Sequence, residues 1–159
     1  ADLTRQERHP NVGYAANKAA SGILNTNEML IQAKTNTTLE AIEERLRESA
    51  ARQQFGVIAV HDLKETLAKK GVDLSQDCRI YEVCNPRQAK KALDANGAIS
   101  TALPCRISVY GTPGNYTLAT LRPTEMMKGF GTPDMDAVAR EVEDVLVRMI
   151  ADAAGPSAA

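Results

Sequence analysis

The chain has 159 residues, 43% of them hydrophobic and 25% charged, which is enough for one core but short for two domains. Its 19 basic and 20 acidic residues leave a net charge of −1, and this balance disfavours binding to nucleic acid or to an anionic membrane. No apolar run approaches the roughly 20 residues that would span a bilayer. We expect an arm at residues 1–28, one domain at residues 29–151 and a flexible tail at residues 152–159.

The first residues contain no apolar segment of the signal-peptide type, and the chain begins at Ala1 rather than at a methionine. Removal of a leader before a small residue would explain this start, so we favour an exported, periplasmic protein over a cytoplasmic one. Residues 15–24 are rich in small side chains and could form a loose helix or part of the arm.

The predicted domain opens with a strand at residues 29–33, followed by a helix. Thr37 and Glu40 match a capping box, and apolar residues then recur at helical spacing, so this helix should continue to about Gln53. Residues 55–60 are almost wholly apolar, which favours a strand in a central position of the sheet, covered on at least one side.

Two more helices have recognisable boundaries. Asp62 and Glu65 match another capping box, which predicts a short helix that ends at Gly71. After the strand at residues 80–84, Asn85 can serve as the N-cap of the next helix, with Pro86 as its first residue. Cys84 therefore lies where a strand gives way to a helix.

In the helix that begins at Pro86, Gln88 is the expected capping-box partner of Asn85, and Asn96-Gly97 ends the helix. A β-hairpin should follow, with strands at residues 106–110 and 116–121 and a type II turn at Pro113-Gly114.

Cys105 follows Pro104 and shares one strand face with Ile107 and Val109. The segment at residues 124–131 reads as a loop that carries two methionines and a phenylalanine, which is unusual for a mere connection. The last helix should begin at Thr132-Pro133. Its apolar residues form two rows, Met135, Val138, Val142, Val145 and Met149 beside Ala139, Leu146 and Ile150.

A series of different short motifs lies along the middle of the chain, at residues 55–57, 62–67, 71, 82–86, 89, 93, 103–106 and 121–123. Together they resemble the domain-of-unknown-function family 302 of bacteria and archaea, over residues 29–151. The CNP and LPC elements, which contain Cys84 and Cys105, are the most specific of these motifs. The resemblance implies a small α+β sandwich that tends to form dimers, and it implies no established activity.

The three cysteines include no CxxC or CxxCH pair, which argues against a zinc ribbon, a thioredoxin motif and covalent c-type haem. Cys84 and Cys105 are candidates for redox exchange or soft-metal binding, because a helix N-terminus favours the thiolate. The alternative is that both thiols pack as small hydrophobic groups. Cys78 matches nothing in the family pattern and is expected only to pack.

Three further side chains could contribute to a site. His61 follows an apolar strand beside Asp62, which could orient its ring, although a surface histidine is the simpler reading. Met126 could offer a thioether to copper or an axial ligand to haem, or could fill the space under a loop. Glu82 shares a strand face with Cys84 and should be either a buried, paired carboxylate or a ligand-binding residue.

The predicted order β-α-β-α-β-α-β-β-α indicates a single α+β domain with a mixed sheet and helices mainly on one face. We expect a non-enzymatic binding or accessory module for a small ligand or soft metal, with Cys84, Cys105 and Glu82 as ligand-binding residues and His61 and Met126 as added metal ligands. A thiol-redox or sulfur-handling protein and a structural oligomer subunit are the alternatives. The two apolar rows of the last helix favour a homodimer, with the arm as an alternative cover.

Overall fold

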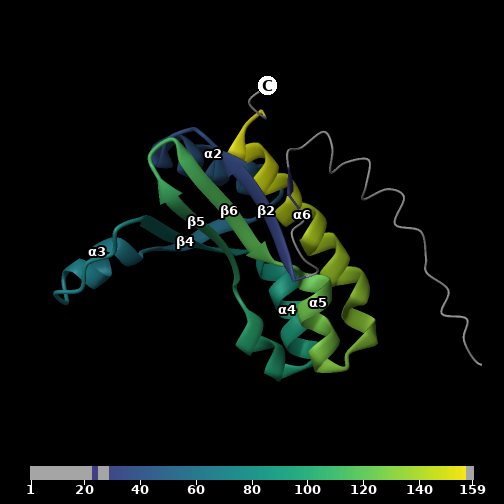
Figure 1. Cartoon of the computed structure of the whole chain (residues 1–159). Helices are drawn as coiled ribbons and strands as arrows, with labels where there is room; N and C mark the ends of the chain where they lie inside the picture. Colours follow the sequence, from purple (N-terminus) through teal and green to yellow (C-terminus); the bar gives the residue numbers. More distant parts are fainter. Residues whose placement is uncertain (1–22, 25–28, 157–159) are drawn as a thin grey trace, which may run out of the picture.

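The structure is a computed structural model that describes residues 23–24 and 29–156, and its strands pair into one sheet in the order β1-β2-β6-β5-β4-β3 (Figure 1). The strands are β1 (Ile23–Leu24), β2 (Leu30–Thr35), β3 (Gly56–Asp62), β4 (Asp77–Cys84), β5 (Cys105–Thr112) and β6 (Asn115–Leu121). Every pairing is antiparallel, which corrects the expected mixed sheet. Strands that run the same way, such as β2 and β5, are always separated by one that runs the other way. An antiparallel sheet with helices packed on it is an α+β fold, so the predicted fold class is confirmed.

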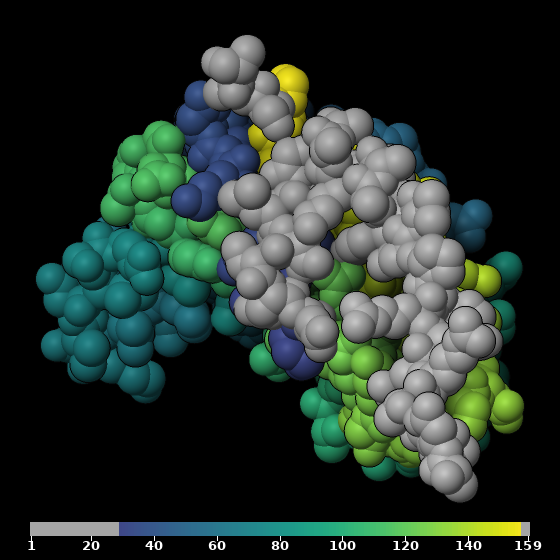
Figure 2. Space-filling model, turned by 45° about the vertical axis from the view of Figure 1, so that its right-hand side comes forward, coloured from purple at the N-terminus to yellow at the C-terminus, as the bar shows by residue number. Residues whose placement is uncertain are grey.

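The α-helices are α2 (Leu39–Arg52), α3 (Leu63–Ala68), α4 (Pro86–Ala95), α5 (Pro123–Met127) and α6 (Asp136–Ala154). Three 3₁₀ turns, η1 (Gly97–Ala102), η2 (Lys128–Phe130) and η3 (Pro133–Met135), lie between them. Helices α2 and α6 cover one face of the sheet, whereas α4 and α5 lie beyond its lower end (Figure 1). Figure 2 shows α3 projecting from the side of the molecule. No helix in the described ranges is long and apolar enough to cross a membrane.

Several boundaries differ from the sequence predictions. Ile23 and Leu24 form a strand against β2 rather than the end of a loose helix, and the rest of the predicted arm lies outside the described residues. The segment predicted as a loop is helical, because Pro123 occupies the first turn of α5, where its missing N–H costs nothing. At the other end, α6 continues to Ala154, so the predicted tail starts too early.

Two predicted caps are also corrected. Thr38, not Thr37, caps α2 and accepts from the Ala41 N–H. Asn85 caps α4 as expected, but Gln88 does not reach back to complete a capping box. Its side-chain amide donates instead to Glu141 on α6, at 3.0 Å, because tertiary packing brings that carboxylate within reach.

Strand β3 lies at the edge of the sheet, which contradicts the expected central position. Within the part of the chain that the structure describes, it pairs only with β4, and a bulge between Val57 and Ala59 interrupts that pairing. The side chain of Ile58 is consequently 60% exposed. A continuous apolar run does not by itself separate a central strand from an edge strand, because it says nothing about the number of neighbours.

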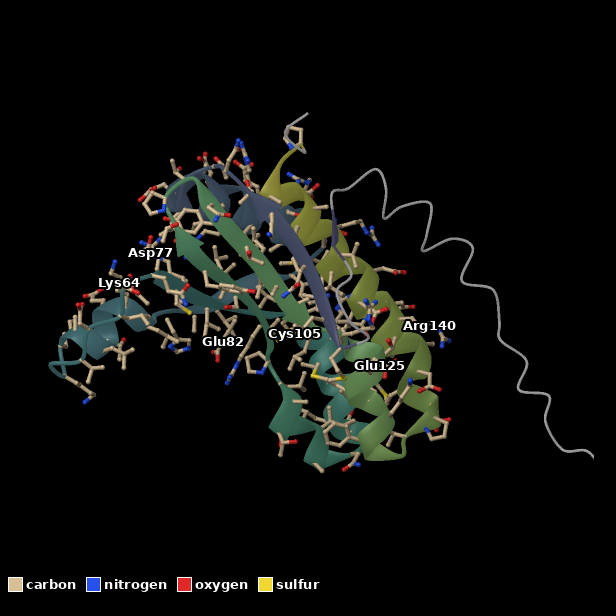
Figure 3. All side chains as sticks on the ribbon, in the orientation of Figure 1. Lys64, Asp77, Glu82, Cys105, Glu125 and Arg140 are labelled. Atoms are coloured by element: carbon tan, nitrogen blue, oxygen red, sulfur yellow. The ribbon has the colours of Figure 1, made fainter. Side chains whose placement is uncertain are left out.

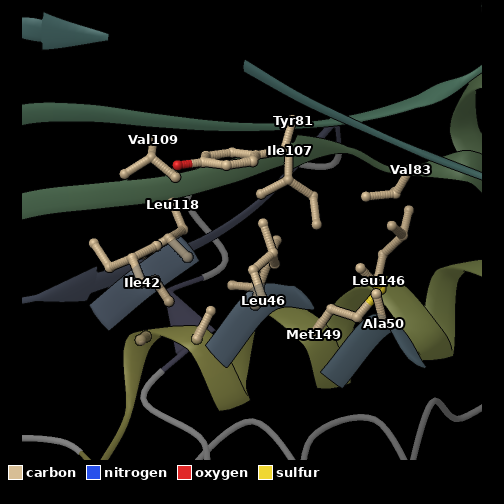
Figure 4. Packing of buried hydrophobic residues seen from close by; sticks show 14 of the residues in the cluster. Ile42, Leu46, Ala50, Tyr81, Val83, Ile107, Val109, Leu118, Leu146 and Met149 are labelled. Atoms are coloured by element: carbon tan, nitrogen blue, oxygen red, sulfur yellow. The ribbon is translucent and has the colours of Figure 1, made fainter. Parts of the chain in front are cut away.

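The main core lies between the sheet and helices α2 and α6. Ile42, Leu46 and Met149 from the helices face Tyr81 and Leu118 from the sheet (Figure 4), and all five side chains are fully buried. A second, smaller cluster joins Met135, Ala92 and Ile99, with Val138 packed against it.

These two clusters account for the two apolar rows of α6. The N-terminal end of the stripe packs against α4 and η1, through Met135 and Val138, and the rest packs in or against the main core, through Leu146, Met149 and Ile150. Among the described residues, none of the large, exposed hydrophobic side chains belongs to α6. Within the described residues these contacts bury or half-bury both rows, so the helix does not by itself require a partner, and a dimer stays a prediction.

Candidate functional site

A cavity of about 340 Å³ lies at the end of the sheet, under helices α4, α5 and α6. Its walls come from the ends of β4 and β5, from one face of α4 and from η1, with Val138 and Val142 of α6 closing the far side. The wall residues are apolar apart from Asn85, Gln88, Ser100 and the two thiols. No Asp, Glu, Lys, Arg or His of the described chain lines this cavity.

The order of elements explains why a hollow forms here. Cys84 ends β4, Asn85 caps α4 through the N–H groups of Arg87 and Gln88, and the chain turns away from the sheet at that point. It returns through η1 and a cis Leu103-Pro104 peptide to begin β5 at Cys105. The helix that leaves the sheet and the turn that returns to it thus enclose the space between them.

A buried ion pair holds α5 against α6 on the opposite side of the cavity. Arg122 lies 3.5 Å from Glu143, and the same carboxylate accepts hydrogen bonds from the N–H and hydroxyl of Thr124 at 3.3 and 2.7 Å. These contacts fix the start of α5, and with it the position of Met126 and Met127 in the cavity wall.

Sulfur atoms gather around this cavity. The chain has 3 cysteines and 5 methionines, and the wall contains Cys84, Cys105, Met126, Met127 and Met135. The structure therefore brings Cys84, Cys105 and Met126 into the wall of one cavity. Figure 3 labels Cys105 where the sheet meets α4 and α5.

The two wall cysteines are free thiols. Cys105 lies directly across the strand pair from Val83, the residue before Cys84. Burial raises the pKa of the Cys105 thiol from 9.0 to about 11, and the neighbouring Cys84 adds to the shift. Cys105 is therefore protonated at neutral pH. Cys78, by contrast, lies opposite Tyr110 in the pairing of β4 with β5, and it lies outside the cavity wall.

Glu82 and His61 do not join the cysteines. They lie on β4 and β3, with His61 Nε2 at 3.5 Å from Glu82 Oε1, and Arg106 Nε lies at the same distance from that oxygen. Glu82 is thus a half-buried carboxylate that lies near His61 and Arg106, and it does not line the cavity with the cysteines. Asp62 does not orient the His61 ring, because its carboxylate caps α3 and approaches Arg79.

The metal-ligand set predicted from the sequence is only partly assembled. Cys84, Cys105 and Met126 share a wall, whereas His61 belongs to the group around Glu82. Within the described ranges, no three His, Cys, Asp or Glu side chains are grouped so that they could hold a metal ion. Besides the two thiols, the soft ligand atoms that this wall offers are the thioethers of its methionines.

Sequence reasoning missed most of the cavity wall. The sequence predicts Gln88 only as a capping-box partner, and Val138 and Val142 only as members of a helix stripe. The sequence does indicate one part of the wall. Gln88, Ala89, Ala92 and Leu93 lie on one face of α4, as their helical spacing implies. What that face encloses depends on η1 and α6, which are distant in sequence.

Comparisons with known proteins agree with this architecture. The model of the family "Domain of unknown function DUF302" matches residues 31–153. A crystal structure of an uncharacterized conserved protein DUF302 from Bacillus stearothermophilus is similar, with a TM-score of 0.75 and 29% sequence identity, covering 81% of this chain and 100% of that one. No curated protein matches the sequence.

Proposed function

We propose that this chain, which belongs to the family of the domain of unknown function DUF302, is a non-enzymatic binding module for a small apolar ligand. The observation that carries the proposal is the cavity at the end of the sheet, with its volume of about 340 Å³ and its apolar wall. Pockets of roughly 300–1,000 Å³ with a few polar groups are typical of small-molecule sites.

The wall chemistry supports binding over catalysis. With no acidic, basic or histidine side chain in the described wall, the cavity offers no general acid or base other than its two thiols, and the thiol of Cys105 has its pKa raised to about 11. Its Asn85 amide is already used, since Oδ1 accepts from two backbone N–H groups and Nδ2 donates to the Gln54 carbonyl. A ligand here would be held mainly by burial of its apolar surface.

A soft metal ion is a second candidate, favoured by the sulfur atoms of Cys84, Cys105 and Met126 in one wall. Thiolate and thioether groups are the ligands that copper(I) selects. The metal would have to displace the proton of Cys105, whose pKa is raised to about 11.

A thiol-redox role for the same cysteines has weaker support. Exchange with a disulfide proceeds through the thiolate, and the raised pKa of Cys105 leaves little thiolate at neutral pH. This alternative predicts reversible exchange of both thiols with a disulfide reagent, whereas the binding module needs none.

The test is a titration with N-phenyl-1-naphthylamine, an uncharged probe whose fluorescence rises in apolar surroundings. We expect one saturable site on the native protein. Replacing Val142, in the cavity wall, by Phe should weaken binding about tenfold or more, which corresponds to a loss of roughly 1.4 kcal/mol.

The matched control is Val72→Phe, because Val72 is 52% exposed and lies outside the cavity wall. It should bind the probe like the native protein, and circular dichroism should show both variants folded. Failure of the folded native protein to bind the probe, or equal binding by Val142→Phe, would disprove the proposal.

A further inference from the structure

One polar atom near the cavity lacks a partner. Gln88 lies in the first turn of α4 and lines the cavity, and its Oε1 atom is buried without a hydrogen bond in the described structure. Thr132 Oγ1 is in the same situation, but Thr132 does not line the cavity. A buried carbonyl oxygen without a donor is unfavourable, so its presence in a cavity wall needs an explanation.

The orientation of the Gln88 amide follows from its neighbour. Its Nε2 donates to Glu141 Oε2 at 3.0 Å. A carboxylate can only accept, so turning the amide over would place two oxygens against each other. The acceptor Oε1 is therefore held away from Glu141 and is available to a donor.

The other polar groups of the wall do not supply that donor. The Asn85 side-chain N–H₂ donates to the Gln54 carbonyl, and its oxygen accepts from the N–H groups of Arg87 and Gln88. The hydroxyl of Ser100, also in the wall, does not donate to Gln88 Oε1. The thiols of Cys84 and Cys105 are only weak donors. A hydrogen-bond donor on the ligand would satisfy Gln88 without any change in the protein.

From these observations we propose that the ligand is an uncharged aromatic molecule with one O–H or N–H group, such as a phenol or an indole, and that Gln88 Oε1 accepts that hydrogen bond. The proposal rests on the function proposed above. The uncharged wall excludes an ionised ligand, because no counter-charge in the described wall offsets its lost hydration. Met126, Met127 and Met135 favour an aromatic ring, since thioether sulfur packs well against aromatic edges.

The test compares two competitors of N-phenyl-1-naphthylamine, 1-naphthol and 1-methoxynaphthalene, at neutral pH. Both have the same ring system, but only 1-naphthol can donate a hydrogen bond. On the native protein we expect 1-naphthol to bind about tenfold more tightly, the effect of one hydrogen bond to a buried acceptor. In Gln88→Met, which keeps the length of the side chain but removes the acceptor, this ratio should fall to about one.

Ser100→Ala is the matched control, because Ser100 also lines the cavity and its loss leaves Gln88 in place. It should keep the native ratio. Equal binding of the two competitors by the native protein, an unchanged ratio in Gln88→Met, or loss of all probe binding in that variant would each overturn the role of Gln88. Absence of probe binding to the native protein would instead refute the proposed function, so the two failures are distinguishable.

Discussion

The guanidinium of Arg122 lies 3.5 Å from the carboxylate of Glu143, and the two side chains are only 9% and 10% exposed. Arg122 follows β6 and Glu143 lies near the middle of α6, so the pair joins the sheet to the helix at the point where α5 begins. A buried ion pair of this kind is costly to break, because removing one partner leaves the other charge without compensation.

Glu143→Ala should therefore destabilise the protein by about 3–5 kcal/mol. Urea unfolding measures the loss, and Asp144→Ala serves as the control, because Asp144 is exposed on the same helix and its loss should cost less than about 0.5 kcal/mol. Equal unfolding midpoints for the two variants would show that the ion pair contributes nothing.

Gly111→Ala should also be strongly destabilising. Gly111 has φ of +138°, and a Cβ there would lie 2.2 Å from the backbone oxygen of Asn115 across the hairpin. We expect a loss of about 3 kcal/mol or more from strain and overlap. Gly97→Ala is the control, because a Cβ at Gly97 meets nothing within 4 Å. Thermal unfolding that ranks the two variants the other way would contradict this account of the hairpin.

The raised pKa of Cys105 predicts a loss of stability in alkali. The folded state holds the thiol proton up to about pH 11, whereas the unfolded chain releases it near its ordinary pKa of 9.0. Between these values the folded state binds more protons, so the free energy of unfolding falls as pH rises. Stability of Cys105→Ala should fall less over this range than that of the native protein, and Cys78→Ala should behave like the native protein.

If copper(I) occupies the cavity, Cys84→Ser and Cys105→Ser should each weaken binding by more than the roughly tenfold that loss of an outer-shell partner costs. Competition with a chromophoric copper(I) chelator under anaerobic conditions measures this. Cys78→Ser is the control, because Cys78 lies outside the cavity wall. Affinity should rise with pH, since the metal must displace the Cys105 proton. Equal effects of all three substitutions would exclude the site.

The features predicted correctly from the sequence depend on neighbours within a few residues. Asn85 caps α4 and Pro86 begins it, and Pro113 and Gly114 form the turn between β5 and β6. Such features need only a side chain that satisfies a nearby N–H, or a residue suited to one backbone conformation. The cap of α2 was misplaced by one residue because Thr37 and Thr38 carry the same hydroxyl, and their local sequence does not separate them.

The site was decided by contacts between distant residues. The sequence placed Cys84 and Cys105 at strand ends, but their common cavity depends on the antiparallel register that sets Val83 opposite Cys105, and on α6 closing the far wall. Likewise, the sequence predicts a capping box between Gln88 and Asn85, whereas in the structure the Gln88 amide donates to Glu141. Periodicity tells which face of an element is buried, whereas the identity of the facing element depends on how the whole chain packs. A side chain with several possible partners pairs with the one that packing brings within reach. Packing of the whole chain therefore determined both the cavity and the orientation of the Gln88 amide in its wall.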